Sequence, residues 1–404
     1  MPSFEQARQI VMEAASGLLR APTSETVELL EALGRILAEP ILADRDYPPF
    51  HRATRDGFAV RAADVTGAGR ILDIIGEIKA GDSFSGEIRS GQCAQIMTGA
   101  AVPPGADSVV MIEHTKPSKT RVAVERAAEA GQNVVPKGSE ARAGQTLLGP
   151  GTRLGYPELA IAAQVGRTKL AVAKKPRVAV LSTGDEVVLV DQTPGPFQIR
   201  NSNSISLASQ VLLAGGEPVL LGNAADRVED LRKKVETGLT SDILILSGGV
   251  SMGKYDFVEM VLRALGAQFF FDTVEIRPGK PAVFGICKGK LVFGLPGNPV
   301  STMVTFELFV PPAIELLSGA KPRPLPVFRA KLEAPVKLKA PLTHFLPARV
   351  EWTGGEPKVR ELPWKGSGDI VALGQANAYL VVRPEKLELA AGELVEVLPR
   401  RGSL

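Results

Sequence analysis

The sequence predicts a multidomain α/β protein whose central domain has three layers around a mostly parallel sheet. Three observations indicate this fold class: four strands that are apolar on both faces, helical segments between them, and β-rich texture on either side. A chain of 404 residues also exceeds one ordinary hydrophobic core, so several domains are expected.

The chain opens with an amphipathic helix. Ser3 and Gln6 form a capping-box pattern, and apolar residues then recur on one helical face. A second short helix is predicted over 24–33. After a long insertion the chain returns to this region, so residues 1–45 and 145–175 are assigned to one N-terminal α+β domain.

Two further regions have the texture of β-structure. Residues 46–144 contain short apolar runs, such as 71–75 and 108–112, between Gly and Pro turns, which predicts a β-rich inserted module. Residues 327–404 alternate strands and turns, for example at 345–352, and predict a small C-terminal β-barrel.

The central α/β domain is assigned to residues 176–320. Helical segments separate its strands, and this alternation predicts a parallel, three-layer α/β domain. A Pro-rich stretch at 321–326 then reads as a stiff linker. The predicted strands are 178–181, 218–221, 243–246 and 291–293.

Composition excludes several classes of function. The net charge of +3 provides no field to gather nucleic acid, so any anion recognition is local. The two cysteines and three histidines exclude a thiolate metal site and make zinc chemistry or a Ser-His-Asp triad a poor prediction. The N-terminus resembles no signal peptide and no apolar run is long enough to span a bilayer, so we expect a cytoplasmic protein without membrane contact.

Three strands of the central domain run into unusual loops. The loop segments are 182–186, 247–253 and 294–299, and two of them are rich in glycine. In an open parallel sheet these loops meet at the carboxyl edge, where ligands bind. Glycines allow backbone N–H groups to approach an anion, and a following helix start adds partial positive charge.

Acidic residues in the same region suggest a metal ion. Asp185 and Glu186 would repel a phosphate unless a divalent cation lay between them, and hard oxygen ligands suit Mg²⁺. Asp226 and Asp256 lie in loops at or near the same edge and are candidates to share it. The segment 277–281, Arg-Pro-Gly-Lys-Pro, places two cations on a rigid turn suited to phosphate or oxyanion oxygens.

Each of these signals has a simpler explanation. A Gly-Gly pair after a strand is often only a tight turn, adjacent carboxylates often cap a helix, and Pro-Gly-Lys-Pro is often a surface turn. Gly248, Gly253 and Lys254 approximate a P-loop, but Tyr255 stands where a Ser or Thr hydroxyl is needed for Mg²⁺, which argues against an NTPase. The coincidence of all the loops on one sheet edge favours a phosphate-and-metal pocket.

Read together, the motifs resemble the MoeA family of molybdopterin molybdotransferases, to which the C-terminal domain of gephyrin is related. The likeness covers essentially the whole chain, in the family's order. The matching segments are 55–59 (Arg-Asp-Gly-Phe-Ala), 96–100 (Ile-Met-Thr-Gly-Ala), 182–186 (Ser-Thr-Gly-Asp-Glu), 247–251 (Ser-Gly-Gly-Val-Ser), 278–281 (Pro-Gly-Lys-Pro) and 295–301 (Leu-Pro-Gly-Asn-Pro-Val-Ser).

The resemblance implies an elongated four-domain chain that forms a homodimer through its N-terminal domain. It also implies insertion of molybdate into adenylylated molybdopterin, with Mg²⁺-dependent release of AMP, and a molybdopterin adenylyltransferase as the upstream partner. The implied catalytic residues are Asp56, Thr98, Asp185, Glu186, Asp226 and Asp256, the last four also being the metal ligands. The implied substrate-binding residues are Gly248, Gly249, Val250, Ser251, Arg277, Gly279, Lys280, Pro296, Gly297, Asn298 and Ser367.

The active site of this family lies between the α/β domain of one subunit and the β-rich module of the other. Asp56 and Thr98 are accordingly expected to act in trans. The chain also departs from the family pattern: Val135 and Thr273 stand where basic residues are expected, and Arg55 is a candidate to compensate. Two other functions remain open, namely adenylyl transfer to molybdopterin, although Val250 interrupts the Gly-Gly-Thr-Gly of those enzymes, and a non-catalytic pterin-binding scaffold.

Overall fold

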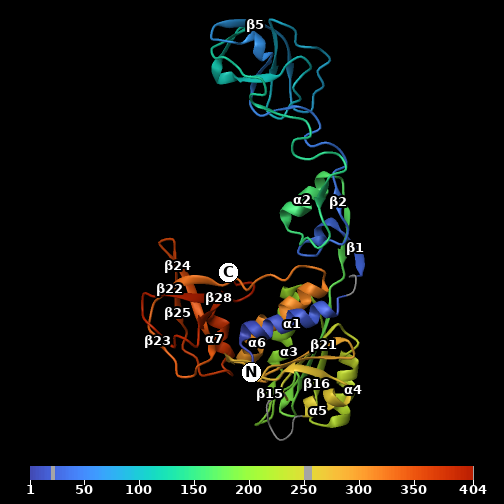
Figure 1. Ribbon diagram of the computed structural model, residues 1–404, viewed down its shortest axis with the longest axis vertical. Helices are drawn as coiled ribbons and strands as arrows, with labels where there is room; N and C mark the ends of the chain where they lie inside the picture. The colour runs from blue at the N-terminus through green and yellow to red at the C-terminus, as the bar shows by residue number, and fades with distance from the viewer. Residues whose placement is uncertain (20–22, 250–256, 404) are drawn as a thin grey trace.

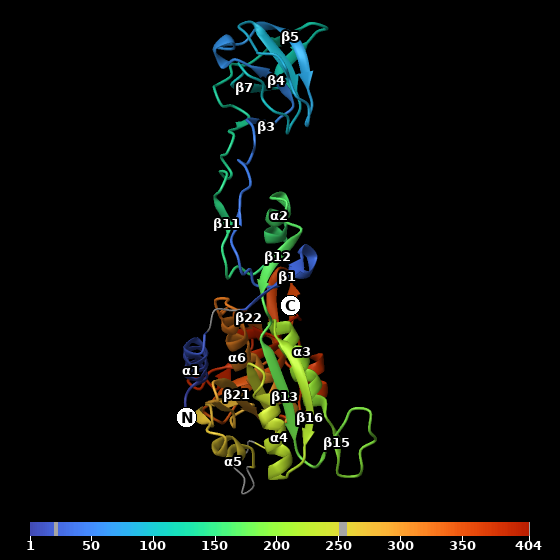
Figure 2. The ribbon, with the colours of Figure 1, turned by 90° about the vertical axis from the view of Figure 1, so that its right-hand side faces the viewer.

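The computed structural model describes residues 1–19, 23–249 and 257–403. The molecule is elongated (Figures 1 and 2). A β-rich module stands at one end of a thin arm, a small α+β module forms the middle of the arm, and the α/β domain lies at the other end beside the C-terminal barrel. The predicted multidomain α/β fold class is confirmed.

The α/β domain is built on a six-stranded mixed sheet. Its strand order is β16-β13-β17-β21-β20-β18. The first four strands run parallel to one another, β20 pairs antiparallel with β21, and β18 pairs antiparallel with β20. The strands are β13 (Arg177–Thr183), β16 (Glu217–Ala224), β17 (Ile243–Ser247), β18 (Gln268–Phe271), β20 (Val283–Cys287) and β21 (Lys290–Leu295). The four strands predicted from the sequence are the parallel ones.

Helices cover both faces of this sheet. Successive residues of β13 show the alternation: Val178 and Val180 join one buried cluster, Ala179 and Leu181 the other. The first cluster packs against α3 and α6, and the second against α4 and α5. The bounds are α3 (Ser202–Ala214), α4 (Val228–Gly238), α5 (Phe257–Ala264) and α6 (Pro299–Leu317), with a short parallel pair, β14 (Val187–Val188) and β15 (Ile199–Arg200), before α3.

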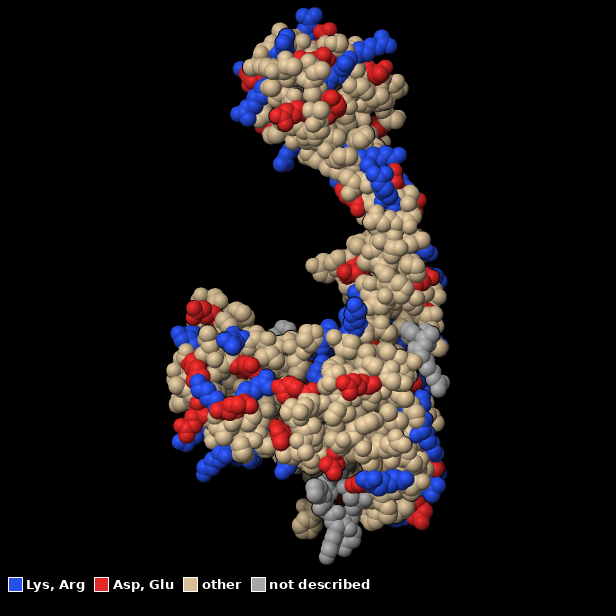
Figure 3. Space-filling view, viewed as in Figure 1, with Lys and Arg blue, Asp and Glu red and all other residues tan. Residues whose placement is uncertain are grey.

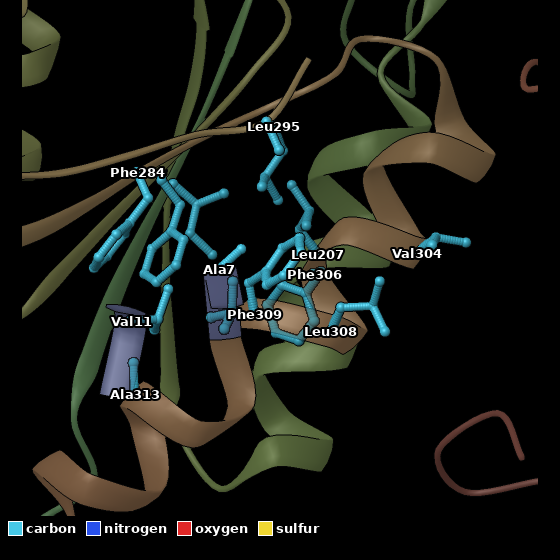
Figure 4. Packing of buried hydrophobic residues seen from close by; sticks show 14 of the residues in the cluster. Ala7, Val11, Leu207, Phe284, Leu295, Val304, Phe306, Leu308, Phe309 and Ala313 are labelled. Carbon is cyan, nitrogen blue, oxygen red and sulfur yellow. The ribbon is translucent and has the colours of Figure 1, made fainter. Parts of the chain in front are cut away.

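Helix α1 (Phe4–Gly17) belongs to the core of the α/β domain, which corrects its assignment to the N-terminal domain. Its capping box between Ser3 and Gln6 is present as predicted. Ala7 and Val11 lie beside Phe309 of α6, in a buried cluster (Figure 4). The apolar face was correctly read from the sequence, but its partner is a helix three hundred residues away, which periodicity does not reveal.

The middle of the arm is a small module through which the chain passes twice. Strand β1 (Ser24–Glu28) pairs antiparallel with β12 (Lys169–Ala173), and β2 (Ile41–Leu42) pairs with β11 (Thr146–Leu148). The predicted helix over 24–33 is therefore wrong, because pairing with β12 overrides the local pattern and leaves only a 3₁₀ turn, η1 (Leu29–Ala32). Helix α2 (Tyr156–Gln164) covers the module.

The β-rich module at the end of the arm is a six-stranded sheet folded over two small cores. Its strand order is β7-β4-β6-β5-β9-β8, and a separate pair, β3 with β10, joins it to the arm. The elements are β3 (Arg52–Ala53), β4 (Gly57–Val60), η2 (Ala62–Asp64), β5 (Arg70–Ile78), β6 (Gln92–Ile96), β7 (Ser108–Met111), η3 (Ile112–His114), β8 (Thr115–Pro117), β9 (Arg121–Val124) and β10 (Val134–Val135).

The C-terminal region forms a closed five-stranded barrel in the order β24-β25-β22-β28-β26, with β26 pairing back to β24. Strand β19 (Ile276–Arg277) reaches out of the α/β domain to pair with β24, which fastens the two together. The barrel elements are β22 (Phe328–Leu332), β23 (Val336–Lys337), β24 (Thr343–Thr353), β25 (Glu356–Glu361), α7 (Ile370–Gln375), β26 (Ala378–Val382), β27 (Glu388–Leu389) and β28 (Leu394–Pro399). The predicted small β-barrel is confirmed.

Helix α6 alone among the helices of the described residues is long and apolar enough to cross a bilayer. However, 83% of its most apolar stretch is buried inside the protein, between the sheet, α1 and α3. A helix with apolar residues on all of its faces is expected to be buried in this way at the centre of a folded domain.

Candidate functional site

Several strands of the parallel sheet end at one level, which brings the loops after them together. Ser182 of β13 pairs with Ser247 of β17, and Ser247 pairs with Leu295 of β21. On the other side, Thr183 pairs with Ala224 of β16. The loops that follow therefore share the carboxyl edge of the sheet, the position at which open α/β sheets bind ligands.

A cavity of about 470 Å³ lies between these loops. Its wall includes the first residues of two helices, Ser202 of α3 and Pro299 of α6. The first N–H groups of a helix lack partners within the helix, and the helix dipole adds partial positive charge there. Among the described residues of the wall, Arg200 is the one basic side chain. The cavity is therefore suited to an anionic ligand.

The glycine pair after β17 allows the loops to pack closely. A Cβ at Gly249 would lie 2.8 Å from the hydroxyl of Thr183 and 2.9 Å from Val258, and at Gly248 it would lie 2.9 Å from the carbonyl oxygen of Thr183. Both glycines have positive φ angles, +92° at Gly248 and +64° at Gly249. The pair is thus more than a tight turn, because its missing side chains bring backbone to the cavity wall.

Hydrogen bonds hold the wall of the cavity in place. The hydroxyl of Ser182 lies 3.0 Å from Oδ1 of Asn201 and 2.9 Å from the hydroxyl of Ser204, below the start of α3. In the first turn of α3, Asn203 donates from Nδ2 to the hydroxyl of Ser247 (2.9 Å) and to the carbonyl of Gly297 (2.8 Å). A single amide thus ties the loops after β17 and β21 to α3.

Three buried polar atoms at this edge have no hydrogen-bond partner in the described part of the chain. They are the hydroxyl of Thr183 and the Oδ1 atoms of Asn203 and Asn223. Thr183 and Asn203 line the cavity. Because an unpaired buried acceptor costs about 1–3 kcal/mol, its persistence at a cavity wall indicates a place where a bound ligand supplies the partner.

The predicted acidic residues occupy the rim of this cavity. Glu186 and Asp226 line it, and Asp185 accepts a hydrogen bond from the backbone of Asp226 (3.1 Å). All three are exposed, and none pairs with a basic side chain of the described residues. The segment after Asp185 and Glu186 is β14, so these carboxylates do not cap a helix. Behind them, the pKa of Asp230 is lowered by the backbone N–H of Ala225, which it accepts at 2.9 Å.

These carboxylates fit a metal ion that arrives with its ligand. No group of three or more acidic, His or Cys side chains among the described residues is close enough to form a preformed metal cage. Mg²⁺ does not need one, since it usually takes one or two carboxylates plus phosphate oxygens and water. Glu186 and Asp226, unpaired on one cavity wall, provide such a donor set.

The Arg-Pro-Gly-Lys-Pro turn reaches the same neighbourhood from the barrel side. Pro281 lines the cavity, whereas Arg277 and Lys280 are exposed beside it without lining it. Gly279 has φ +105°, and a Cβ there would lie 2.5 Å from Thr305 of α6, so this turn is packed on the domain. Arg277 is also the last residue of β19, which pairs with the barrel strand β24.

The loop after β21 provides the remaining predicted contacts. Pro296, Gly297 and Asn298 all line the cavity, and Asn298 immediately precedes α6. Ser367 of the barrel accepts a hydrogen bond through its carbonyl from the N–H of Val300 at 2.9 Å, in the first turn of α6. Ser367 itself does not line the cavity, so its predicted role in substrate binding stays a prediction.

Two predicted residues, Asp56 and Thr98, lie together in the β-rich module at the far end of the arm (Figures 1 and 2). Asp56 accepts from both the backbone N–H (2.6 Å) and the hydroxyl (2.7 Å) of Thr98. These two hydrogen bonds lower the pKa of Asp56. Within one chain, the structure brings Asp56 and Thr98 to each other but not to the cavity.

Three predicted residues, Val250, Ser251 and Asp256, lie outside the described residues. The sequence reasoning also missed five polar residues of the cavity wall: Thr183, Arg200, Asn201, Ser202 and Asn203. Thr183 lies within a matching motif, but no signal singles it out. The other four form the segment 200–203 (Arg-Asn-Ser-Asn), and the cap that Asn201 forms for α3 is a signal that could have located them.

The fold and the cavity together define a class: a multidomain α/β protein with a polar cavity at the carboxyl edge of a mostly parallel sheet. Comparison with known proteins identifies the family. Residues 2–166 match the MoeA N-terminal region (domain I and II), 179–316 a probable molybdopterin binding domain, and 329–399 the MoeA C-terminal region (domain IV).

Individual relatives agree over nearly the whole length. The molybdopterin molybdenumtransferase of Nostoc sp. is 35% identical, covering 98% of this chain and 94% of its own. That of Bacillus subtilis is 35% identical over 93% and 89%. A solved structure of the molybdopterin biosynthesis MoeA protein from Pyrococcus horikoshii has a TM-score of 0.78 and 32% identity, covering 99% of both chains. The chain belongs to the MoeA family of molybdopterin molybdenumtransferases.

Proposed function

We propose that this enzyme inserts molybdate into adenylylated molybdopterin and releases AMP in a reaction that depends on Mg²⁺. The observation that carries the proposal is the cavity at the sheet edge, where unpaired carboxylates stand beside two helix N-termini. Without a cation, those carboxylates would repel an anion bound in the cavity. Together the two features suit a phosphorylated ligand that is bridged to the protein by a divalent cation.

The backbone of the cavity is assigned to the phosphates. The starts of α3 and α6 line the cavity and add the partial positive charge of their helix dipoles, and Gly248 and Gly249 admit the ligand close to the chain. Arg200 adds a guanidinium that can take two phosphate oxygens at once. Asn203, whose Oδ1 is unpaired, provides an acceptor for a hydroxyl or amine group of the substrate.

The rim carboxylates are assigned to the metal. Glu186 and Asp226, which line the cavity, would hold Mg²⁺, with Asp185 next to Asp226 through its backbone hydrogen bond, and Asp256 is assigned to the same set from sequence. When bound, Mg²⁺ neutralises phosphate oxygens and stabilises the charge that develops on the departing AMP. The protein's own part is to orient the phosphates and to leave these acids free of competing cations.

The cations on the barrel side are assigned to the second substrate. Arg277 and Lys280 lie on the turn next to Pro281, which lines the cavity, and Ser367 adjoins the first turn of α6. Molybdate is a dianion, so two exposed cations beside the phosphate pocket are suited to hold it near the dithiolene sulfurs of the pterin. A molybdopterin adenylyltransferase upstream supplies the nucleotide-activated substrate.

We further propose that the active form is a homodimer with shared sites. In one chain the arm holds Asp56 and Thr98 away from the α/β domain, so they reach a cavity only if it belongs to a second copy. Exposed leucines along the base of the arm and on α3 provide an apolar surface for that contact. They are Leu30, Leu33, Leu212 and Leu213, with exposures of 84%, 61%, 59% and 55%.

One assay tests the reaction. Purified protein is mixed with adenylylated molybdopterin and Mg²⁺, with and without molybdate, and AMP is quantified. We expect AMP release that requires both molybdate and Mg²⁺. ATP consumption with bare molybdopterin would instead indicate an adenylyl-transferring enzyme, and binding without either reaction would indicate a scaffold.

Mixed dimers test the shared site. Asp56→Asn and Asp185→Asn chains, each inactive alone, are unfolded together and refolded in equal amounts. If the two residues act on one site across the interface, each mixed dimer regains one intact site, so about a quarter of wild-type activity returns. If both residues act within one chain, no activity returns.

A further inference from the structure

A second cavity, of about 280 Å³, lies where the α/β domain, the Pro-rich linker and the end of the barrel meet. Figure 3 shows basic side chains gathered at the base of the arm. The cavity is lined by Arg8 of α1, Arg323 of the linker, Arg400 and Arg401 after β28, and Glu307 and Glu315 of α6. It is separate from the cavity at the sheet edge, with which it shares no lining residue.

The two carboxylates are buried and paired. Glu307 and Glu315 are 4% and 2% exposed. Arg401 lies 3.2 Å from Glu307, and Arg323 lies 2.7 Å from Glu315, which Arg153 of the arm also approaches at 3.3 Å. These contacts account for both negative charges.

Arg8 is explained by the two prolines in the middle of α6. Pro312 has no N–H, so the carbonyl of Leu308, four residues earlier, loses its helical partner. Arg8 donates to that carbonyl at 2.8 Å and to the carbonyl of Arg323 at 2.8 Å. Both acceptors are neutral, so the charge of Arg8 is not matched by a carboxylate hydrogen bond.

The cavity consequently has an excess of positive charge. Four guanidinium groups line it against two carboxylates, which leaves two charges unmatched. The groups influence one another: burial lowers the pKa of Arg8, Glu315 opposes this, and the nearby Arg401 lowers it further. The pKa of Arg153 is likewise lowered by burial and by Arg323, against the opposing effect of Glu315. Like charges held this close in a partly buried space favour a counter-anion.

Donors are available to hold such an anion. Arg401 uses Nε for Glu307, and among the described residues its Nη atoms have no hydrogen-bond partner. Arg400 makes one long hydrogen bond, 3.4 Å from Nη1 to the carbonyl of Leu373. A planar guanidinium with free N–H groups matches two oxygens of a tetrahedral anion.

We propose that this junction cavity binds a small tetrahedral dianion, of the phosphate, sulfate or molybdate type, between Arg8, Arg323, Arg400 and Arg401. The cavity joins residues of α1, α6, the linker and the barrel terminus, so a bound dianion links the barrel to the α/β domain. The inference does not depend on the reaction proposed at the sheet edge.

Titration calorimetry tests the proposal on the full-length protein in chloride buffer of constant ionic strength, with sodium molybdate, sulfate and phosphate as separate titrants. We expect dianion binding that the Arg400→Gln variant weakens about tenfold, because one charge-assisted hydrogen-bonding group is lost. Arg360→Gln, an exposed arginine of β25 without an ion pair to a described residue, is the matched control and should bind as wild type.

The titrants distinguish the source of the anion. Molybdate binding at least about tenfold tighter than sulfate indicates a site for the proposed substrate, and equal binding indicates a general phosphate or sulfate site; both support the proposal. Crystals grown with tungstate then locate the ion by its anomalous scattering. Heavy-atom density absent from the junction cavity, or wild-type affinity in Arg400→Gln, overturns the proposal irrespective of how that variant folds.

Discussion

The acids at the sheet edge and the acids of α6 are the same residue types in opposite situations. Asp185, Glu186 and Asp226 are exposed and have no basic partner among the described residues, whereas Glu307 and Glu315 are buried and held by arginines. A buried charge must be paired, because leaving it alone costs several kcal/mol. An exposed acid costs little to leave free. The comparison indicates that the paired acids maintain the fold, whereas the rim acids are free to contact the ligand proposed for the cavity.

The largest effect is expected on the stability of the protein, from removal of one of the buried, paired acids. Glu315→Ala leaves Arg153 and Arg323 without their common carboxylate and should lower the free energy of unfolding by about 3–5 kcal/mol. Urea unfolding followed by circular dichroism measures it. Glu351→Ala, which removes an exposed barrel acid paired with Arg349 at 2.9 Å, is the control and should cost under about 1 kcal/mol. Equal losses in the two variants would contradict the assignment.

Substitution of the free acids at the sheet edge should instead reduce activity and leave stability unchanged. Asp185→Asn, Glu186→Gln and Asp226→Asn should each reduce AMP release by at least about 10²-fold, because each removes charge at the proposed metal. Their unfolding free energies should stay within about 0.5 kcal/mol of wild type, since the side chains are exposed. Normal turnover in most of these variants would place the site elsewhere.

A smaller effect is expected at Asn203, whose side chain has one group that is hydrogen-bonded within the protein and one that is free. Its Nδ2 group holds the fold through Ser247 and Gly297, while its Oδ1 is unpaired at the cavity wall. Asn203→Asp keeps the acceptor but not the donor, and Asn203→Ala loses both. Pterin-nucleotide affinity, measured by fluorescence titration, should fall about tenfold in Asn203→Ala, in the range of one or two hydrogen bonds. Unchanged affinity would show that Asn203 does not contact the ligand and has only a structural role.

The smallest effect concerns Asp56, which is exposed like the rim acids yet already hydrogen-bonded. The hydrogen bonds from Thr98 lower the folded-state pKa of Asp56, so their contribution to stability is present above its unfolded pKa and is lost as the pH falls through the folded pKa. Thr98→Val removes the hydroxyl but not the backbone donor. The pKa of Asp56, followed by carbon NMR, should therefore rise only part of the way to its ordinary value. No change would exclude the hydroxyl as a cause.

Much of the site was readable from the chain because its parts are local. Glycines after a buried strand, acids after another, and a Pro-Gly-Asn-Pro loop each carry their meaning within a few residues. Thr183, Arg200 and Asn203 were missed because their roles depend on what faces them. Thr183 matters through its contact with the glycine pair, and Asn203 through bridges to two loops about 40 and 90 residues away.

The same division holds for the fold. Strands buried on both faces, helices with an apolar face and the alternation of the two determined the α/β class and the barrel directly from the sequence. Only the tertiary structure decided that α1 packs on α6 and that 24–28 is a strand, because the first depends on a distant partner and the second on pairing with β12. Local pattern sets what each segment can bury, whereas contacts far apart in sequence decide where it does so and which charges remain free.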